Sequence, residues 1–172
     1  MKRPFLDADV LVRLSVSGAT TSGLLFLATL NTPVQYVTSA YAMREMYGCF
    51  SDDDWPPRAA IACVMAVGRL LVSSKLYVRE TSPSQERIDA LRECCTDKKD
   101  IPILADAIDE GCSVVLTTDG QLLKSTAGIP CMTPDEWLSA IGSDEEVRAV
   151  LQAFAAPLLA LPVFQQVAAG PG

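Results

Sequence analysis

The sequence predicts a three-layer α/β/α fold with a mostly parallel central sheet and a C-terminal helical extension. Short segments rich in β-branched and aromatic residues alternate with helix-length segments along the chain, which is the order expected when helices connect parallel strands. One short segment, SVVLTT, is apolar through its centre without alternation, as is typical of a strand covered on both faces. With 172 residues, 49% of them hydrophobic, the chain is long enough for one domain with a solid core.

The first half of the chain is expected to supply three strands and several helices. The strands are predicted at RPFL, VQYVTS and LYV, because these segments carry β-branched and aromatic residues. Two apolar helix-length segments, VLVRLSVSG and TSGLLFLATL, follow the first strand, and a third helix, AYAMREMYGCF, begins after Ser39. The segment WPPRAAIACVMAVGRLL is predicted to be a helix entered through its prolines, since proline is favoured at the first helical position.

Three capping sequences, in which Ser or Thr precedes an acid or amide by three residues, mark helix starts in the second half. The first is Ser82–Gln85, which would place Pro83 at the first helical position. The second is Thr133–Glu136, before EWLSAIG, and the third is Ser143–Glu146, before a C-terminal helix. Between the first two, IPILADAIDEG is predicted to be a helix that ends at Gly111.

The chain is predicted to divide near Gly142. Residues 1–141 would form the main domain, and residues 142–172 would form a helical tail that serves interaction or packing. The tail contains VRAVLQAFAAPLLALPVF, which is too apolar to remain in water. We therefore expect it to pack on the main domain, on a second copy or on a partner.

The composition excludes several classes of protein. The chain has no histidine, which removes Ser-His-Asp and Cys-His catalysis and most zinc sites. Its six cysteines include no C-x-x-C pair, so we expect reduced thiols in a cytoplasmic protein. We find no segment apolar enough to cross a membrane and no signal peptide. Taken alone, the net charge of −7 argues against non-specific nucleic-acid binding.

Four acids occupy positions from which they could converge. Asp7 directly follows the strand RPFL, and Asp119 directly follows SVVLTT, so both would lie at the carboxyl edge of a parallel sheet. Asp100 opens the helix IPILADAIDEG, and Glu45 lies in the second turn of the helix after VQYVTS. Purely structural interpretations remain open: Asp119 could form a turn, Asp100 could cap its helix, and Glu45 could be a solvated residue on the helix surface. Asp7 is the hardest to explain in that way, because it closes an apolar strand.

Convergent carboxylates repel one another, so three or four of them require a cation to stay ionised together. Without histidine, such a site would be built from oxygen atoms, which select Mg²⁺ or Mn²⁺. These ions bind phosphate oxygens and activate water. The acids therefore indicate phosphoryl chemistry with a metal-activated water as the nucleophile.

The order of these motifs resembles that of PIN-domain ribonucleases and, in size, most nearly the VapC-type toxins of toxin–antitoxin pairs. The quoted segments are FLDADVLVRL, SAYAMREMYG with Glu45, KDIPILADAIDEG with Asp100, VVLTTDGQLL with Thr117 and Asp119, and the closing IPCMTPDEWL. The resemblance spans about residues 4–140. It implies metal ligands at Asp7, Glu45, Asp100 and Asp119, with Thr117 hydrogen-bonded within the site and Asp9 in a supporting role.

The same resemblance implies a ribonuclease that uses Mg²⁺ or Mn²⁺, an RNA substrate, a homodimer and an antitoxin protein as partner. Cations near the motifs could hold RNA locally despite the net negative charge, namely Arg13, Arg44, Lys98, Lys99 and Lys124. Two regions depart from the family pattern. The stretch from Ser51 to Thr96 shows no motif, and the tail after Gly142 is longer than expected.

Two other interpretations stay open. A PIN-like domain could bind RNA or protein without cutting. A haloacid-dehalogenase-type phosphatase also begins with a strand and D-x-D, which Asp7 and Asp9 supply, but that family has Thr or Val where this chain has Leu11. The phosphatase would use Asp9 as a general acid. In the PIN interpretation, Asp9 would instead hydrogen-bond backbone or a metal-bound water and fix the loop that presents Asp7.

Overall fold

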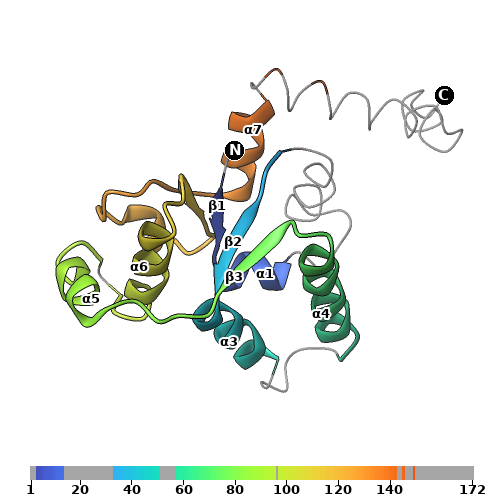
Figure 1. Ribbon diagram of the computed structural model, residues 1–172, viewed down its shortest axis with the longest axis horizontal. Helices are drawn as coiled ribbons and strands as arrows, with labels where there is room; N and C mark the ends of the chain where they lie inside the picture. Colours follow the sequence, from blue (N-terminus) through green and yellow to red (C-terminus); the bar gives the residue numbers. More distant parts are fainter. Residues whose placement is uncertain are drawn as a thin grey trace, which may run out of the picture.

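The protein is built around a central sheet of five parallel strands, as a computed structural model shows (Figure 1). The structure describes residues 3–13, 33–50, 57–95 and 97–142 and positions 145 and 149. The strands lie in the order β3-β2-β1-β4-β5. This confirms the α/β class and the parallel sheet that the sequence predicts.

The observed elements follow the predicted order closely. The strands are β1 (Pro4–Leu6), β2 (Tyr36–Ser39), β3 (Leu76–Arg79), β4 (Val114–Leu116) and β5 (Cys131–Met132). The helices are α1 (Ala8–Arg13), α3 (Ala40–Cys49), α4 (Pro57–Val72), α5 (Gln85–Leu91), α6 (Ile101–Asp109), the short 3-10 helix η1 (Leu122–Lys124) and α7 (Pro134–Gly142). The predicted helix TSGLLFLATL, the capping sequence Ser143–Glu146 and the apolar tail lie outside the described residues.

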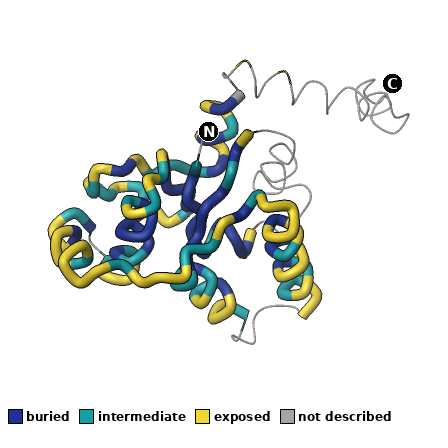
Figure 2. Tube along the Cα trace, in the orientation of Figure 1, coloured by how far each residue is buried: buried dark blue, intermediate teal, exposed yellow. Residues whose placement is uncertain are grey.

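Alternate strand residues face two separate cores, one on each face of the sheet. Leu6, Tyr36 and Leu116 belong to the core that α1, α3, α4 and α7 cover. Phe5 and Val115 belong to the core beneath α5, α6 and η1. β1, β2 and β4 are consequently buried along their length, β3 and β5 are only partly covered, and the helices are exposed on their outer faces (Figure 2). Two covered faces explain why β4 reads as a continuous apolar run in the sequence.

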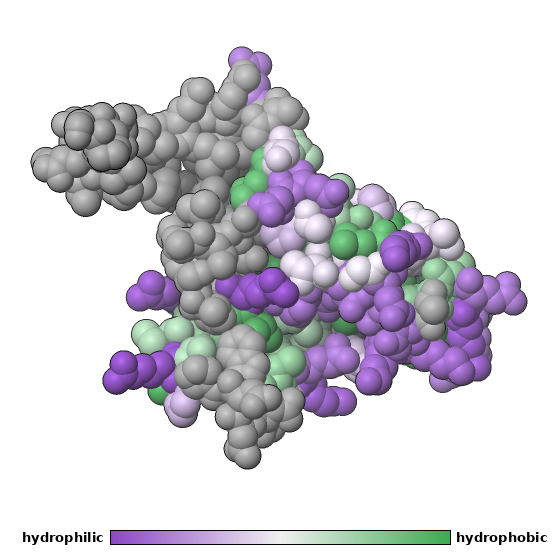
Figure 3. Space-filling model, turned by 180° about the vertical axis from the view of Figure 1, so that it is seen from behind, coloured by the Kyte–Doolittle hydropathy of each residue, from purple (hydrophilic) through white to green (hydrophobic). Residues whose placement is uncertain are grey.

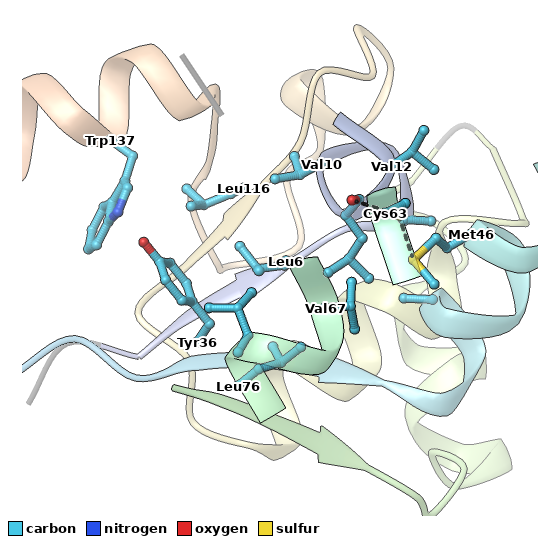
Figure 4. Packing of buried hydrophobic residues seen from close by; sticks show 14 of the residues in the cluster. Leu6, Val10, Val12, Tyr36, Met46, Cys63, Val67, Leu76, Leu116 and Trp137 are labelled. Carbon is cyan, nitrogen blue, oxygen red and sulfur yellow. Dashed lines mark hydrogen bonds between the residues drawn. The ribbon is translucent and has the colours of Figure 1, made fainter. Parts of the chain in front are cut away.

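The first core contains a polar contact among its apolar side chains. Cys63 of α4 lies 3.4 Å from the carbonyl oxygen of Leu11 and 3.6 Å from the Met46 sulfur. Figure 4 shows this contact at one end of the cluster and Trp137 beside Tyr36 at the other. Helices that are distant in the sequence are thereby joined over one face of β1.

The capping sequences have different outcomes. At Thr133 the prediction is correct: its hydroxyl accepts from Glu136 N at 3.2 Å, and Glu136 Oε2 accepts from Thr133 N at 2.7 Å. The assignment of Ser82 is wrong, because α5 begins at Gln85 and Ser84 caps it by accepting from Arg87 N at 3.2 Å. Two serines flank Pro83, and only local backbone geometry decides which one becomes the cap.

Strand order places a switch point at the carboxyl edge of the sheet. The chain passes from β1 to β2 and β3 on one side, and then to β4 and β5 on the other side of β1. β1 and β4 are therefore neighbours at the point where the chain changes direction across the sheet. In open parallel sheets, ligands bind at such a switch point, outside the carboxyl ends of the strands.

Candidate active site

Asp7 is the buried acid at the switch point. It directly follows β1, and its backbone N–H donates to Leu116 O of β4 at 3.1 Å. The side chain is only 5% exposed. It accepts hydrogen bonds from Ala8 N at 2.6 Å and from the Thr117 hydroxyl at 2.7 Å. The edges of two adjacent strands thus fix this carboxylate in one orientation.

Asp9 joins the loop after β1 to the loop after β4. Its Oδ2 accepts a hydrogen bond from Thr118 N at 2.7 Å and a second one from the Thr118 hydroxyl. Its Oδ1 is buried and has no hydrogen-bond partner. Buried polar atoms are generally paired. An additional ligand bound at this position would therefore satisfy the Asp9 oxygen.

Asp119 lies on the exposed turn that follows β4. Its Oδ1 accepts from Gln121 N at 2.6 Å and from Leu122 N at 3.0 Å. Its own N–H donates to the Thr117 hydroxyl at 3.0 Å, so Thr117 connects it to Asp7. The turn that the sequence left open as an alternative is therefore present, and it holds Asp119 next to the buried acid.

Asp100 occupies the N-cap position of α6 but makes no capping hydrogen bond with its side chain. Burial and then the carboxylates of Asp119, Asp97, Glu45 and Asp9, in that order, together raise its pKa to about 6. Asp100 in turn contributes to the raised pKa of Asp7. A role as a helix cap does not account for Asp100, because its carboxylate lies near other acids and accepts no hydrogen bond from the N–H groups at the start of α6.

Glu45 of α3 faces the same group of acids. Burial raises its pKa, while the Tyr41 hydroxyl and Lys99 lower it. The Tyr41 hydroxyl lies within reach of Glu45 and 3.2 Å from the carbonyl oxygen of Lys99. Burial and Glu45 together raise the pKa of Tyr41 to about 12. Glu45 is therefore a partly buried member of the site, not a solvated surface residue.

The electrostatics of the site are those of an uncompensated acidic cluster. Burial, followed by the Asp9 carboxylate, raises the pKa of Asp7 to about 7, although the hydrogen bonds from Thr117 and Ala8 act in the opposite direction. Repulsion of this kind is relieved by a bound cation or by a proton. Asp100 links the acids singled out in the sequence, because Asp119 and Glu45 raise its pKa and it contributes to the raised pKa of Asp7.

The donor set suits a hard divalent cation, since carboxylate oxygens are the ligands that Mg²⁺ and Mn²⁺ prefer. A bound cation would also satisfy the unpartnered Asp9 oxygen and would counter the effects that raise the pKa values of Asp7 and Asp100. Within the described ranges, no three acids or thiols are arranged to enclose an ion as they stand. The chemistry of the residues therefore fits the ion, and their side chains would have to close around it.

Among the five candidate RNA contacts, Lys99 is close enough to Glu45 for its charge to lower the pKa of that acid. Arg44 is exposed on α3 next to Glu45. Arg13 ends α1, Lys98 precedes α6, and Lys124 ends η1; all three are exposed. Seen from behind, the described surface is largely hydrophilic, with small hydrophobic areas between polar side chains (Figure 3).

Two residues that sequence reasoning did not single out belong to the site. Asp97 raises the pKa of both Glu45 and Asp100, and Tyr41 contacts Glu45 and the Lys99 carbonyl. Asp97 could have been found as a second acid in the motif TDKKDIP, three residues before Asp100. Tyr41 carries no such signal, because an aromatic residue in the first turn of a helix usually only packs.

Comparison with known structures identifies the fold as a PIN-domain, VapC-like fold. PAE2754 from Pyrobaculum aerophilum aligns with a TM-score of 0.58 and 15% identity, covering 83% of this chain and 98% of the other. VapBC2 from Rickettsia felis, bound to a DNA fragment from its promoter, aligns with a TM-score of 0.56 and 12% identity, covering 76% and 98%.

Another similar structure is VapC20 from Mycobacterium tuberculosis, a toxin that cleaves the sarcin–ricin loop, with a TM-score of 0.48, 16% identity and coverage of 68% and 90%. No family model matches the sequence, and no curated protein matches it significantly. At these identities, the likeness establishes the fold, and any activity must be argued from the site itself.

Proposed function

We propose that the protein is an endoribonuclease that depends on Mg²⁺ or Mn²⁺. The observation that carries this proposal is the buried Asp7, held at the switch point of a PIN-like sheet, where burial and then the neighbouring acids Asp9 and Asp100 raise its pKa to about 7. Burying such a carboxylate costs folding free energy, and carboxylates with strongly raised pKa values cluster at functional sites. A cation that satisfies the carboxylates would explain why they are gathered there.

In this proposal Asp7, Asp100 and Asp119 hold the metal, and Glu45 places a second ion or the attacking water. A bound Mg²⁺ or Mn²⁺ supplies a nucleophile at neutral pH and stabilises the charge that develops on the phosphate. The Thr117 hydroxyl orients the Asp7 carboxylate through its 2.7 Å hydrogen bond. Asp9 fixes the two loops that present these acids. In-line attack on the phosphodiester would leave 5′-phosphate and 3′-hydroxyl ends.

The exposed cations around the acids are proposed to hold the RNA backbone. Phosphate contacts from Lys and Arg position a nucleic acid without reading its sequence. Lys99 and Arg44 lie beside Glu45, and Lys124 lies on the helix that follows Asp119. Local contacts of this type can operate on a chain whose net charge is −7, provided that the substrate is steered to this edge of the sheet.

We further propose that the enzyme is the toxin of a toxin–antitoxin pair, that it forms a homodimer and that it works in the cytoplasm. The VapC-like fold supports this proposal, and so do the exposed apolar side chains of α4, among them Ile61, Met65 and Val72. No helix among the described residues is long and apolar enough to cross a bilayer. Inspection of the adjacent gene for a small DNA-binding protein, followed by co-purification, would test the partnership.

The proposed activity is tested by incubating the purified protein with labelled single-stranded RNA and Mn²⁺, with and without EDTA. We expect cleavage that EDTA abolishes and that leaves 5′-phosphate ends. The Asp7→Asn variant should be inactive although it remains folded. Cleavage at the full rate in EDTA, or by the purified variant, would exclude the mechanism. A folded protein that binds RNA but never cleaves it would identify a non-catalytic binding domain.

A further inference from the structure

A cavity lies beside the acidic site, at the same edge of the sheet. It has a volume of about 220 Å³ and is lined by the start of α3, the end of β3 with the following loop, α5 and α6. Tyr41 and Arg44 line it on the side of α3. Because Tyr41 also contacts Glu45, the cavity and the acids share a wall, and a chain held at one would pass the other.

The cavity combines flat apolar walls with a polar floor. Pro83, Ile88 and Pro102 line its sides together with Tyr41. Asp106 lies at its floor and is 1% exposed. The Nε atom of Arg79 lies 3.1 Å from Asp106 Oδ1, yet this oxygen has no properly oriented hydrogen-bond donor.

Arg79 is itself held firmly in place. Its guanidinium group bonds to Asp109 and Glu110, each at 3.2 Å, and its Nε donates to Thr81 O at 2.9 Å. The guanidinium group has five N–H groups, so donors remain beyond these three bonds. The cavity floor therefore offers Asp106 Oδ1, an oxygen that is ion-paired with Arg79 but accepts no hydrogen bond, next to the remaining donors of the fixed Arg79 guanidinium group.

We propose that this cavity binds one unpaired nucleobase of the RNA, next to the phosphate that is cut. The inference rests on the proposed ribonuclease function and names how that site would select its substrate. A cavity of this size is smaller than the roughly 300–1,000 Å³ of pockets that enclose drug-sized ligands, and it suits a single planar base. Arg44 at the rim would contact an adjoining phosphate.

The hydrogen-bonding groups indicate which bases fit. Asp106 would accept from an exocyclic amino group, and Arg79 would donate to the neighbouring ring nitrogen. Adenine and cytosine present this pair of groups side by side, and carboxylates accept from the cytosine amino group in known complexes. Uracil presents a carbonyl in place of the amino group. A purely structural role for the Arg79–Asp106 ion pair would join β3 to α6 but would not require an oxygen that accepts no hydrogen bond.

Cavity filling tests the proposal. Ser82 is exposed and lines the cavity, so Ser82→Trp should block it. Ser113 is exposed before β4, at the opposite edge of the sheet, so Ser113→Trp is the matched control. With short labelled strands of oligoadenylate, oligocytidylate or oligouridylate, we expect Ser82→Trp to lower kcat/KM on the first two about tenfold or more, as the loss of one base contact implies, and the control to match wild type.

A second variant measures the selectivity of the cavity among bases directly. Asp106→Asn should shift the ratio of kcat/KM for oligoadenylate and oligocytidylate over oligouridylate by about tenfold, whereas a merely structural defect would lower all three equally. Binding of the same strands without metal, measured by fluorescence anisotropy, separates this proposal from the catalytic one. Base-dependent binding that Ser82→Trp removes, without any cleavage, would support the pocket and refute the nuclease. Cleavage that is equal in both Trp variants and equal on all strands would refute the pocket alone.

Discussion

Asp7 makes the stability of the protein depend on pH at the scale of a single residue. Its pKa in the fold is about 7, against 3.8 for an ordinary aspartate. The folded state therefore holds a proton that the unfolded chain has already released. The resulting stability is fully present below about pH 4 and is lost as the pH rises to about 7, where the folded state must accept a buried charge.

The variant Asp7→Asn tests this linkage. We expect the metal-free wild type to melt at progressively lower temperature between about pH 5 and pH 8, since each pKa unit is worth about 1.4 kcal/mol. In the variant, the melting temperature should depend much less on pH, and at pH 8 it should be several degrees higher than that of the wild type. Mn²⁺ should raise the melting temperature of the wild type at pH 8 and leave the variant unchanged. A variant that melts lower than wild type at pH 8 would show that the ionised carboxylate stabilises the fold.

Asp9 separates two mechanisms through one conservative change. Because Asp9 Oδ2 accepts from Thr118 N, an Asn can keep that bond, so Asp9→Asn should retain cleavage within about tenfold, or about 1.4 kcal/mol. Asp7→Asn should lose at least about a hundredfold. A phosphatase-like general acid at Asp9 would instead lose about 10²–10⁴-fold on amidation. Near-complete loss in both variants, with unchanged circular dichroism, would count against our assignment of Asp9.

At the scale of elements, the sequence was informative wherever one local signal decides the outcome. The capping sequence before α7, the apolar run of β4 and Gly111 after α6 could all be identified from neighbouring residues. Gly111 has a φ of +63°, which suits glycine at a helix end. The start of α5 was assigned wrongly, since Ser82 carries the capping-box signal with Gln85 and Pro83, yet Ser84 is the cap.

The cap of α7 should contribute measurably to stability. Replacing Thr133 with Val keeps the side-chain shape but removes the hydroxyl that accepts from Glu136 N. We expect a loss of about 1 kcal/mol, equivalent to a melting temperature about 2–4 °C lower, with cleavage of RNA unchanged. Thr126→Val is the control, because Thr126 is exposed and lies in a loop without a capping role. Equal melting temperatures for the two variants would show that the cap is unimportant.

At the scale of the whole molecule, the chain order of the acids was predictable but their mutual effects were not. Strand pairing brings the loops after β1 and β4 together, and helix packing adds Glu45 and Asp100. The cavity between α3, β3, α5 and α6 depends on segments near residues 40, 80 and 100 of the chain. No local pattern records such distant contacts, because packing alone determines them.

The segment after Gly142, outside the described residues, carries a prediction that rests on sequence alone. Its apolar stretch needs a partner surface, so deletion after Gly142 should lower solubility or change the oligomeric state. Analytical ultracentrifugation of the full and shortened chains would measure this. An unchanged sedimentation coefficient together with an unchanged melting temperature would show that the segment is dispensable.

The dependence of RNA cleavage on Mn²⁺ concentration is the most direct test of the central claim, that the acidic cluster holds a catalytic cation. We predict a saturable rise in rate for the wild type and a loss of at least about a hundredfold for Asp100→Asn. Asp135→Asn, which changes an exposed acid of α7, should follow the wild-type curve. Cleavage that does not change with Mn²⁺, or an Asp100→Asn curve equal to that of the wild type, would contradict the claim.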